Sequence, residues 1–155
     1  MGTRREGREA AVQMLYQMDL SGVDAEQAIV LYRDPLTAGA DEDLADDDLP
    51  VLGQGGAARR FAEELVRGVA SARERIDETI RGASRHWRLE RMARVDRNVL
   101  RLAVYELLQR DDIPPNVTLN EAVELAKRYG DEGSRAFVNG ILDRVAADQG
   151  NGRRS

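Results

Sequence analysis

Arginine side chains gather at the start of the chain, in the segment TRREGREAAVQMLYQ at residues 3–17. Arg4, Arg5 and Arg8 fall within five positions, although the formal net charge of the 155 residues is -5. The apolar pattern that follows is helical, and cations near the start of a helix interact unfavourably with its dipole. A phosphate bound there would contact both the guanidinium groups and the free N–H groups of the first turn. The segment is therefore a candidate nucleic-acid-binding site, and a solvated first turn is the structural alternative.

The residue types that catalysis and metal binding require are scarce. The chain has no cysteine and one histidine, His86. A single histidine without a cysteine or a converging acid cluster builds neither a zinc site nor a Ser-His-Asp relay, so we predict a structural or surface role for it. The glycine-rich GQGG at 53–56 follows an acidic stretch instead of a strand, which is the wrong context for a phosphate-binding loop. The sequence thus predicts no metal site and no cofactor.

Length and composition are those of one globular domain. The chain is 42% hydrophobic and 33% charged, and it contains neither a run of roughly 18 apolar residues nor a secretory signal pattern. The lack of cysteine removes any need for an oxidising compartment. We therefore expect a single cytoplasmic domain over residues 1–150, no membrane association, and a disordered polar tail at 151–155.

Acidic residues are concentrated in one segment. Seven acids and no lysine or arginine lie between residues 34 and 58, so the rest of the chain carries a net charge of +2. Proline and glycine are also frequent there, which is typical of a solvated loop. We predict a flexible acidic insertion at about 34–56.

Arginine recurs at about three-residue spacing later in the chain. The six positions are Arg85, Arg88, Arg91, Arg94, Arg97 and Arg101. The chain as a whole uses 22 arginines and one lysine, a skew that codon bias explains more simply than recognition does. The interpretation we favour for this stripe is a solvated face.

The hydrophobic periodicity is helical throughout and predicts an all-α protein of about seven helices without a sheet. A first helix closes at Ser21-Gly22, and a short one runs through Tyr32. Residues 57–82 carry a continuous stripe, interpreted as two helices. Residues 94–110 are apolar over more than half of the circumference, so this helix should be central to the core.

Several residues predict where the remaining helices begin and end. Asp24 with Gln27, and Thr118 with Glu121, resemble capping boxes. Pro114-Pro115 stops the central helix, Gly130 ends the next one, and Ser134 is the expected N-cap of the last. Gly140 lies within that last helix at a cost of about 1 kcal/mol relative to alanine, which favours tight helix–helix packing there.

Two stretches resemble the bacterial transcription antitermination factor NusB family. Residues 95–146 are similar to its C-terminal half, especially NEAVELAK at 120–127 and FVNGILD at 137–143, and REAAVQMLYQMDLSG at 8–22 is similar to its first helix. The resemblance implies seven helices in two packed helical bundles and no catalytic activity. It also implies binding to boxA-type single-stranded RNA together with the ribosomal protein NusE. Such a complex joins the transcription elongation complex and supports processive transcription of ribosomal RNA operons.

Individual residues acquire expected roles from this resemblance. Asp96 matches the acidic position on the NusE-facing side. Glu6 stands within the arginine-rich motif where a basic residue is often found, and residues 34–56 are longer and more acidic than the family pattern. The implied RNA-binding residues are Arg4, Arg5, Arg8, Tyr16 and Phe137.

Other classes of function stay open from the sequence. A structural adaptor would bind another helical protein through an apolar groove and would need no arginine tip. An accessory domain is a second alternative, since similar helical modules occur fused to RNA cytosine methyltransferases. The sequence is compatible with a monomer and with a homodimer through the apolar helices.

Overall fold

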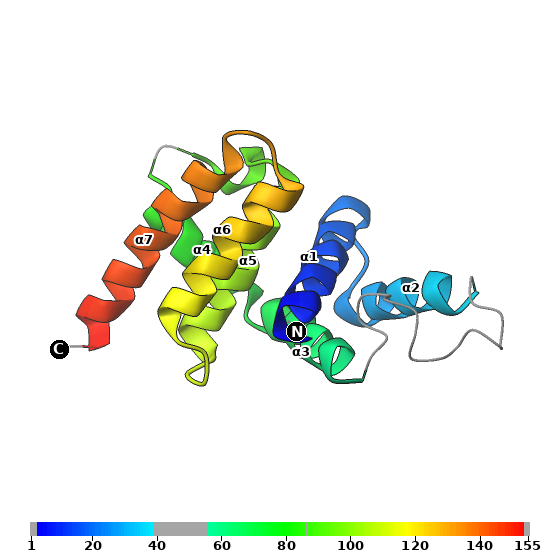
Figure 1. Cartoon of the computed structure of the whole chain (residues 1–155). Helices are drawn as coiled ribbons and strands as arrows, with labels where there is room; N and C mark the ends of the chain where they lie inside the picture. The colour runs from blue at the N-terminus through cyan, green and yellow to red at the C-terminus, as the bar shows by residue number, and fades with distance from the viewer. Residues whose placement is uncertain (1–2, 39–55, 86, 154–155) are drawn as a thin grey trace. The chain divides into compact units, whose positions relative to one another are not determined.

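A computed structural model describes residues 3–38, 56–85 and 87–153, and Figure 1 shows the helices that they form. No strand occurs in these ranges, which confirms the all-α prediction. None of the helices there combines the length and apolar character that a membrane span requires. The chain divides into two compact units, Met1–Ala70 and Ser71–Ser155. The helices are α1 (Thr3–Ser21), α2 (Ala25–Ala38), α3 (Gly56–Ser71), α4 (Arg73–Ala83), α5 (Arg94–Gln109), α6 (Pro115–Tyr129) and α7 (Ser134–Arg153).

The first unit contains α1, α2 and α3. Gly22 follows α1 with a φ of 74°, a conformation that glycine adopts without strain and that ends a helix. The predicted capping box is confirmed, because the Gln27 N–H donates to Asp24 Oδ1 at 2.8 Å and the Asp24 N–H donates to Gln27 Oε1 at 3.0 Å. Two ion pairs then join α2 to α3, Arg67 with Glu26 and Arg33 with Glu63.

Helix α2 is longer than the sequence pattern predicts. It continues to Ala38, whereas the expected helix stopped at Tyr32 and the expected loop began near residue 34. A proline within a helix removes one backbone hydrogen bond and crowds the carbonyl four residues earlier, and nothing in the structure explains why α2 continues past Pro35. Residues 39–55, which hold the rest of the predicted insertion, lie outside the described residues, as does His86.

The second unit contains α4 to α7, with α5 in contact with the other three helices. This confirms α5 as the central helix of its unit. Its Val99, Leu100 and Val104 side chains are fully buried. Arg101 on the same helix is also buried and binds Asp77 of α4 through two hydrogen bonds, 2.8 Å from Nε to Oδ1 and 3.2 Å from Nη2 to Oδ2.

The ends of α6 and α7 correct two of the predicted caps. Helix α6 begins at Pro115, whose fixed φ suits the first helical position, so Thr118 lies inside the helix and is not its N-cap. The Thr118 hydroxyl instead donates to buried Glu106 at 2.8 Å. Ser134 is the first residue of α7, but its hydroxyl turns back to Asp131. Gly130 follows the end of α6 as predicted.

Gly140 does not mark a tight contact. A Cβ added to it would meet no atom within 4 Å among the described residues, so the predicted close packing is wrong there. Nothing in the structure explains this glycine. The close approach occurs at Gly7 of α1, where an added Cβ would lie 2.8 Å from Phe61 Cδ2 and 3.0 Å from the carbonyl oxygen of Ala58.

Candidate nucleic-acid interface

The arginine tip consists of Arg4, Arg5 and Arg8 in the first turn and a half of α1. Two of its guanidinium groups pack on the Phe61 ring of α3. The guanidinium carbons of Arg4 and Arg8 lie 5.2 and 5.5 Å from the centre of the Phe61 ring, within cation–π range. Arg4 and Arg5 are exposed, but Arg8 is buried. The groups presented to solvent are therefore Arg4 and Arg5, and Arg8 contributes by packing on the ring beneath them.

Gly7 permits this packing, and Gly7→Ala is expected to destabilise the protein. Alanine favours a helix by about 1 kcal/mol over glycine, but its Cβ would overlap Phe61 and the α3 backbone, and such overpacking typically costs about 1–3 kcal/mol. Thermal melting followed by circular dichroism should show a lower melting temperature. Gly140→Ala, where the added methyl group meets nothing, is the matched control and should not lower it. A Gly7→Ala protein that melts at or above the original temperature would contradict the close packing.

The two predicted aromatic residues lie in different units. Tyr16 is half-buried on α1, the helix that carries the arginine tip. Phe137 is half-buried on α7 in the second unit. Neither residue is fully buried, and base stacking requires an accessible aromatic side chain.

The structure adds an aromatic residue that the sequence analysis did not select. Trp87 is 60% exposed, and its ring meets Phe137 edge to face, with centroids 5.9 Å apart and planes at 88°. The sequence does place the one tryptophan of the chain between Arg85 and Arg88. Because arginine is frequent throughout the chain, this clustering did not indicate a binding site.

The arginine stripe, the six arginines between residues 85 and 101, is exposed up to the first residue of α5 and buried beyond it. Arg85, Arg88, Arg91 and Arg94 are exposed, as predicted for a solvated face. Arg97 and Arg101 are buried instead, where Arg97 donates to the Leu89 carbonyl at 3.0 Å and Arg101 binds Asp77. The prediction is wrong for these two because α5 turns them toward α4 and the 3-10 turn at Leu89–Arg91.

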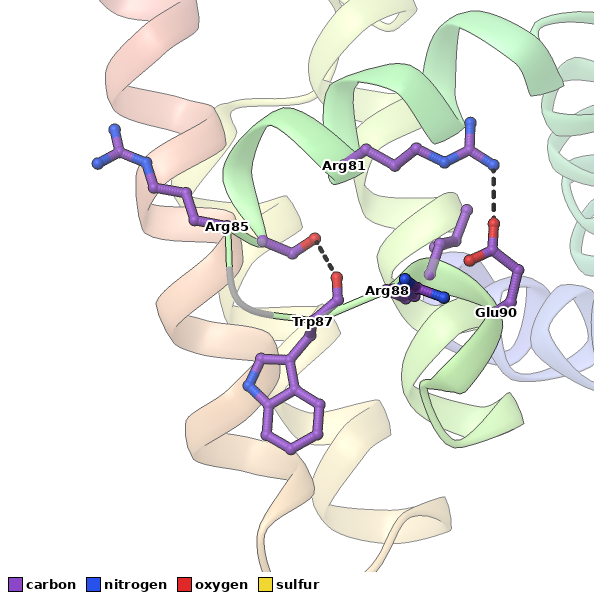
Figure 2. Close-up of a pocket in the computed structure, with 7 residues that line it drawn as sticks. Arg81, Arg85, Trp87, Arg88 and Glu90 are labelled. Atoms are coloured by element: carbon purple, nitrogen blue, oxygen red, sulfur yellow. Dashed lines mark hydrogen bonds and ion pairs between the residues drawn. The ribbon is translucent and has the colours of Figure 1, made fainter.

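A cleft of about 560 Å³ opens beside Trp87 (Figure 2). Its shape is fixed by local hydrogen bonds. The Trp87 N–H donates to the Ser84 carbonyl at 2.7 Å, and the Ser84 hydroxyl donates to the Trp87 carbonyl at 3.1 Å. Arg81 Nη2 donates a hydrogen bond to Glu90 Oε1 at 3.3 Å. The cleft is lined by Arg81, Ser84, Arg85, Trp87, Arg88, Leu89 and Glu90.

Charge in this cleft is predominantly positive. A hydrogen bond from its own backbone N–H lowers the pKa of Glu90, and Arg81 and Arg88 lower it further, so this residue is a carboxylate at neutral pH. With three arginines and one glutamate, the lining carries a net charge of +2. The cleft therefore suits an anionic ligand.

Asp96 lies in the first turn of α5 and is 7% exposed. Its Oδ1 atom has no hydrogen-bond partner among the described residues. Burial raises the pKa of Asp96, a hydrogen bond with Ser134 opposes this, and the charge of Asp131 raises it further. Because the folded state disfavours the carboxylate, its contribution to stability falls as the pH rises from the usual carboxyl pKa through the raised one.

Asp96→Asn is therefore expected to raise the melting temperature of the isolated protein at pH 7, because it removes the buried charge and its repulsion by Asp131. The gain should shrink as the pH falls below the usual carboxyl pKa, where Asp96 is protonated in both states. Melting curves across this range measure it. A lower melting temperature for Asp96→Asn at pH 7 would contradict the unfavourable charge.

The described ranges contain no group of three or more His, Cys, Asp or Glu residues that could hold a metal ion. Each of the two units carries arginines and aromatic rings, groups that bind phosphates and stack on bases.

Comparisons with known proteins agree with this chemistry. The profile of the NusB family matches residues 5–147. The transcription antitermination protein NusB of Geobacter sulfurreducens is 49% identical over 147 residues, which cover 95% of this chain and 96% of that protein. NusB of Myxococcus xanthus is 48% identical over 146 residues, 94% of this chain and 96% of that protein.

Solved structures show the same similarity. T. maritima NusB superimposes with a TM-score of 0.71 at 40% identity, covering 94% of this chain and 91% of that one. A crystal structure of the antitermination factors NusB and NusE in complex with dsRNA gives a TM-score of 0.74 at 27% identity, covering 96% and 98%. From the family match and the identity to its members, the chain belongs to the NusB family.

Proposed function

We propose that this protein is a non-catalytic transcription antitermination factor of the cytoplasm. It binds boxA-type single-stranded RNA together with a NusE-type ribosomal protein and, within the transcription elongation complex, supports processive transcription of ribosomal RNA operons. The observation that carries the proposal is the similarity over 96% of the chain to a NusB that was crystallised with NusE in complex with dsRNA, and the preference for a single strand is part of the proposal.

The surface chemistry supports RNA as a ligand. Arg4 and Arg5 place two exposed guanidinium groups at a helix start, where they can bind phosphates. Tyr16 and Phe137 are aromatic residues that are only half-buried, and aromatic side chains can stack on bases. Since few phosphate contacts are available, the protein alone should bind RNA weakly and with marked salt dependence, and a partner should strengthen the complex.

Asp96 is proposed to bind the partner. Its Oδ1 atom is buried without a hydrogen-bond partner in the described residues, and a donor from a second protein would remove that deficit. Asp96→Ala, which removes the acceptor oxygen, should then weaken capture of the NusE-type protein more than it weakens RNA binding by the isolated protein.

A mobility-shift experiment tests the proposed function. A boxA-like RNA and a permuted RNA of the same composition are each titrated with the protein, with and without a NusE-type partner. We expect a weak, salt-sensitive shift by the protein alone and a tighter shift with the partner, both stronger for the boxA-like RNA. Equal shifts for the two RNAs, or no shift under any condition, would contradict the proposal.

A further inference from the structure

Trp87 is a large aromatic residue held at the surface. Its indole is 60% exposed, although burying a tryptophan is strongly favourable. Two hydrogen bonds with Ser84 hold the Trp87 backbone, and its ring meets Phe137 edge to face. An accessible indole with such a neighbour can stack on a flat ligand.

Arginines flank Trp87 in the chain and line the same cleft. Arg85 lies two positions before Trp87 and Arg88 directly follows it, and both arginines are exposed. Figure 2 shows them extending to different sides of the turn that carries Trp87, with the Arg81–Glu90 pair farther along the cleft. The cations are spread out and do not converge on one point. This arrangement suits successive phosphates of an extended strand better than the single phosphate of a small molecule.

We propose that Trp87, Arg85 and Arg88 form a stacking site for one unpaired base of the RNA and its flanking phosphates. The inference rests on the proposed function and assigns to RNA binding a part of the second unit that the sequence analysis interpreted as a solvated face. A base in a duplex is already stacked and paired, so the site selects single-stranded RNA.

Intrinsic fluorescence tests the site directly, because Trp87 is the only tryptophan of the 155 residues. Titration of the whole protein with a single-stranded boxA-like RNA should quench and saturate the emission. The same RNA annealed to its complement should quench it much less, and uridine monophosphate should not saturate the signal at the same concentrations. Saturable quenching by the mononucleotide at those concentrations would overturn the assignment to an extended strand.

Variants measure the contribution to affinity, with the labelled RNA followed by fluorescence anisotropy. Trp87→Ala should weaken binding by about fivefold to a hundredfold, and Trp87→Phe by less. Since loss of the Phe137 contact can itself alter the fold, Arg85→Ala/Arg88→Ala, which keeps the indole, is the second test. It should lower the slope of log affinity against log salt by about 1.4. Arg75→Ala, an exposed arginine of α4 outside the cleft, is the control and should bind as the original protein does.

The outcomes separate this site from the proposed function. Undiminished RNA binding by Trp87→Ala, with no quenching in the original protein, would overturn the stacking site and leave the proposed function intact. Failure of the original protein to bind RNA, with or without partner, would overturn both. A Trp87→Ala protein that keeps its RNA affinity but loses capture of the NusE-type protein would assign the cleft to the protein partner and overturn the RNA assignment.

Discussion

Arg101→Ala is expected to lower the free energy of unfolding by about 3–5 kcal/mol, the usual cost of breaking a buried ion pair from one side. Both side chains of the pair are nearly inaccessible, and Arg101 donates two hydrogen bonds to Asp77. Its removal leaves a buried carboxylate whose remaining cationic neighbour is the half-exposed Arg73, 3.3 Å away. Chemical unfolding in urea, followed by circular dichroism, measures the change.

Arg73→Ala is the matched control for this pair. It removes an arginine from the same carboxylate, but Arg73 is 45% exposed, so the loss should stay below about 1 kcal/mol. Equal effects of the two substitutions would contradict the view that Arg101 is the principal partner of Asp77. A loss under about 1 kcal/mol for Arg101→Ala would contradict the buried pair itself.

Arg4→Ala/Arg5→Ala is expected to weaken RNA binding about tenfold at physiological salt and to lower the salt slope by about 1.4, since two phosphate contacts are lost from a single strand. Arg8 is left in place because it is buried against Phe61, and its truncation would disturb the packing of α1 on α3. Anisotropy measurements across a salt titration provide both quantities.

The control for the arginine tip is Arg67→Ala in the same unit. Arg67 is an exposed arginine that pairs with Glu26 and lies on α3. It should leave the RNA affinity and the salt slope unchanged. If Arg4→Ala/Arg5→Ala kept the original slope, the tip would not contact phosphate.

Local patterns predicted much of the fold. The reciprocal bonds of Asp24 and Gln27, the stop at Gly22 and the central position of α5 all depend on neighbours in the sequence or on one helix face. The arginine tip was also visible, since its residues are adjacent in the chain. Such features need no knowledge of which distant segments meet.

The errors concern contacts between distant segments. Arg101 is predicted as solvated by its spacing, and its burial depends on Asp77, 24 positions away. Thr118 looks like a helix cap, but Pro115 starts the helix earlier and the hydroxyl meets Glu106. Trp87 becomes notable only when Phe137 is seen beside it. The role of such a residue depends on a partner that is distant in the sequence, so the local pattern alone does not predict it.

The same limit applies to the candidate site. The sequence could identify Arg8 as basic, but not that Phe61 of α3 holds it in the protein interior. It could identify Asp96 as acidic, but not that one of its oxygens is buried without a partner in the described residues. The burial of Arg8 and the Asp96 oxygen that has no partner among the described residues therefore determine which substitutions can test RNA binding and partner binding without disturbing the fold.

Transcription through a terminator is the most direct measurement of the proposed antitermination activity. A template with a boxA element upstream of the terminator is transcribed by a bacterial RNA polymerase with its other elongation factors and the NusE-type protein, with and without this chain. A second template carries a permuted boxA. We predict that the chain increases readthrough on the boxA template, that the permuted template loses the increase, and that Arg4→Ala/Arg5→Ala reduces it. Readthrough that is unaffected by the chain, or increased equally on both templates, would contradict the account.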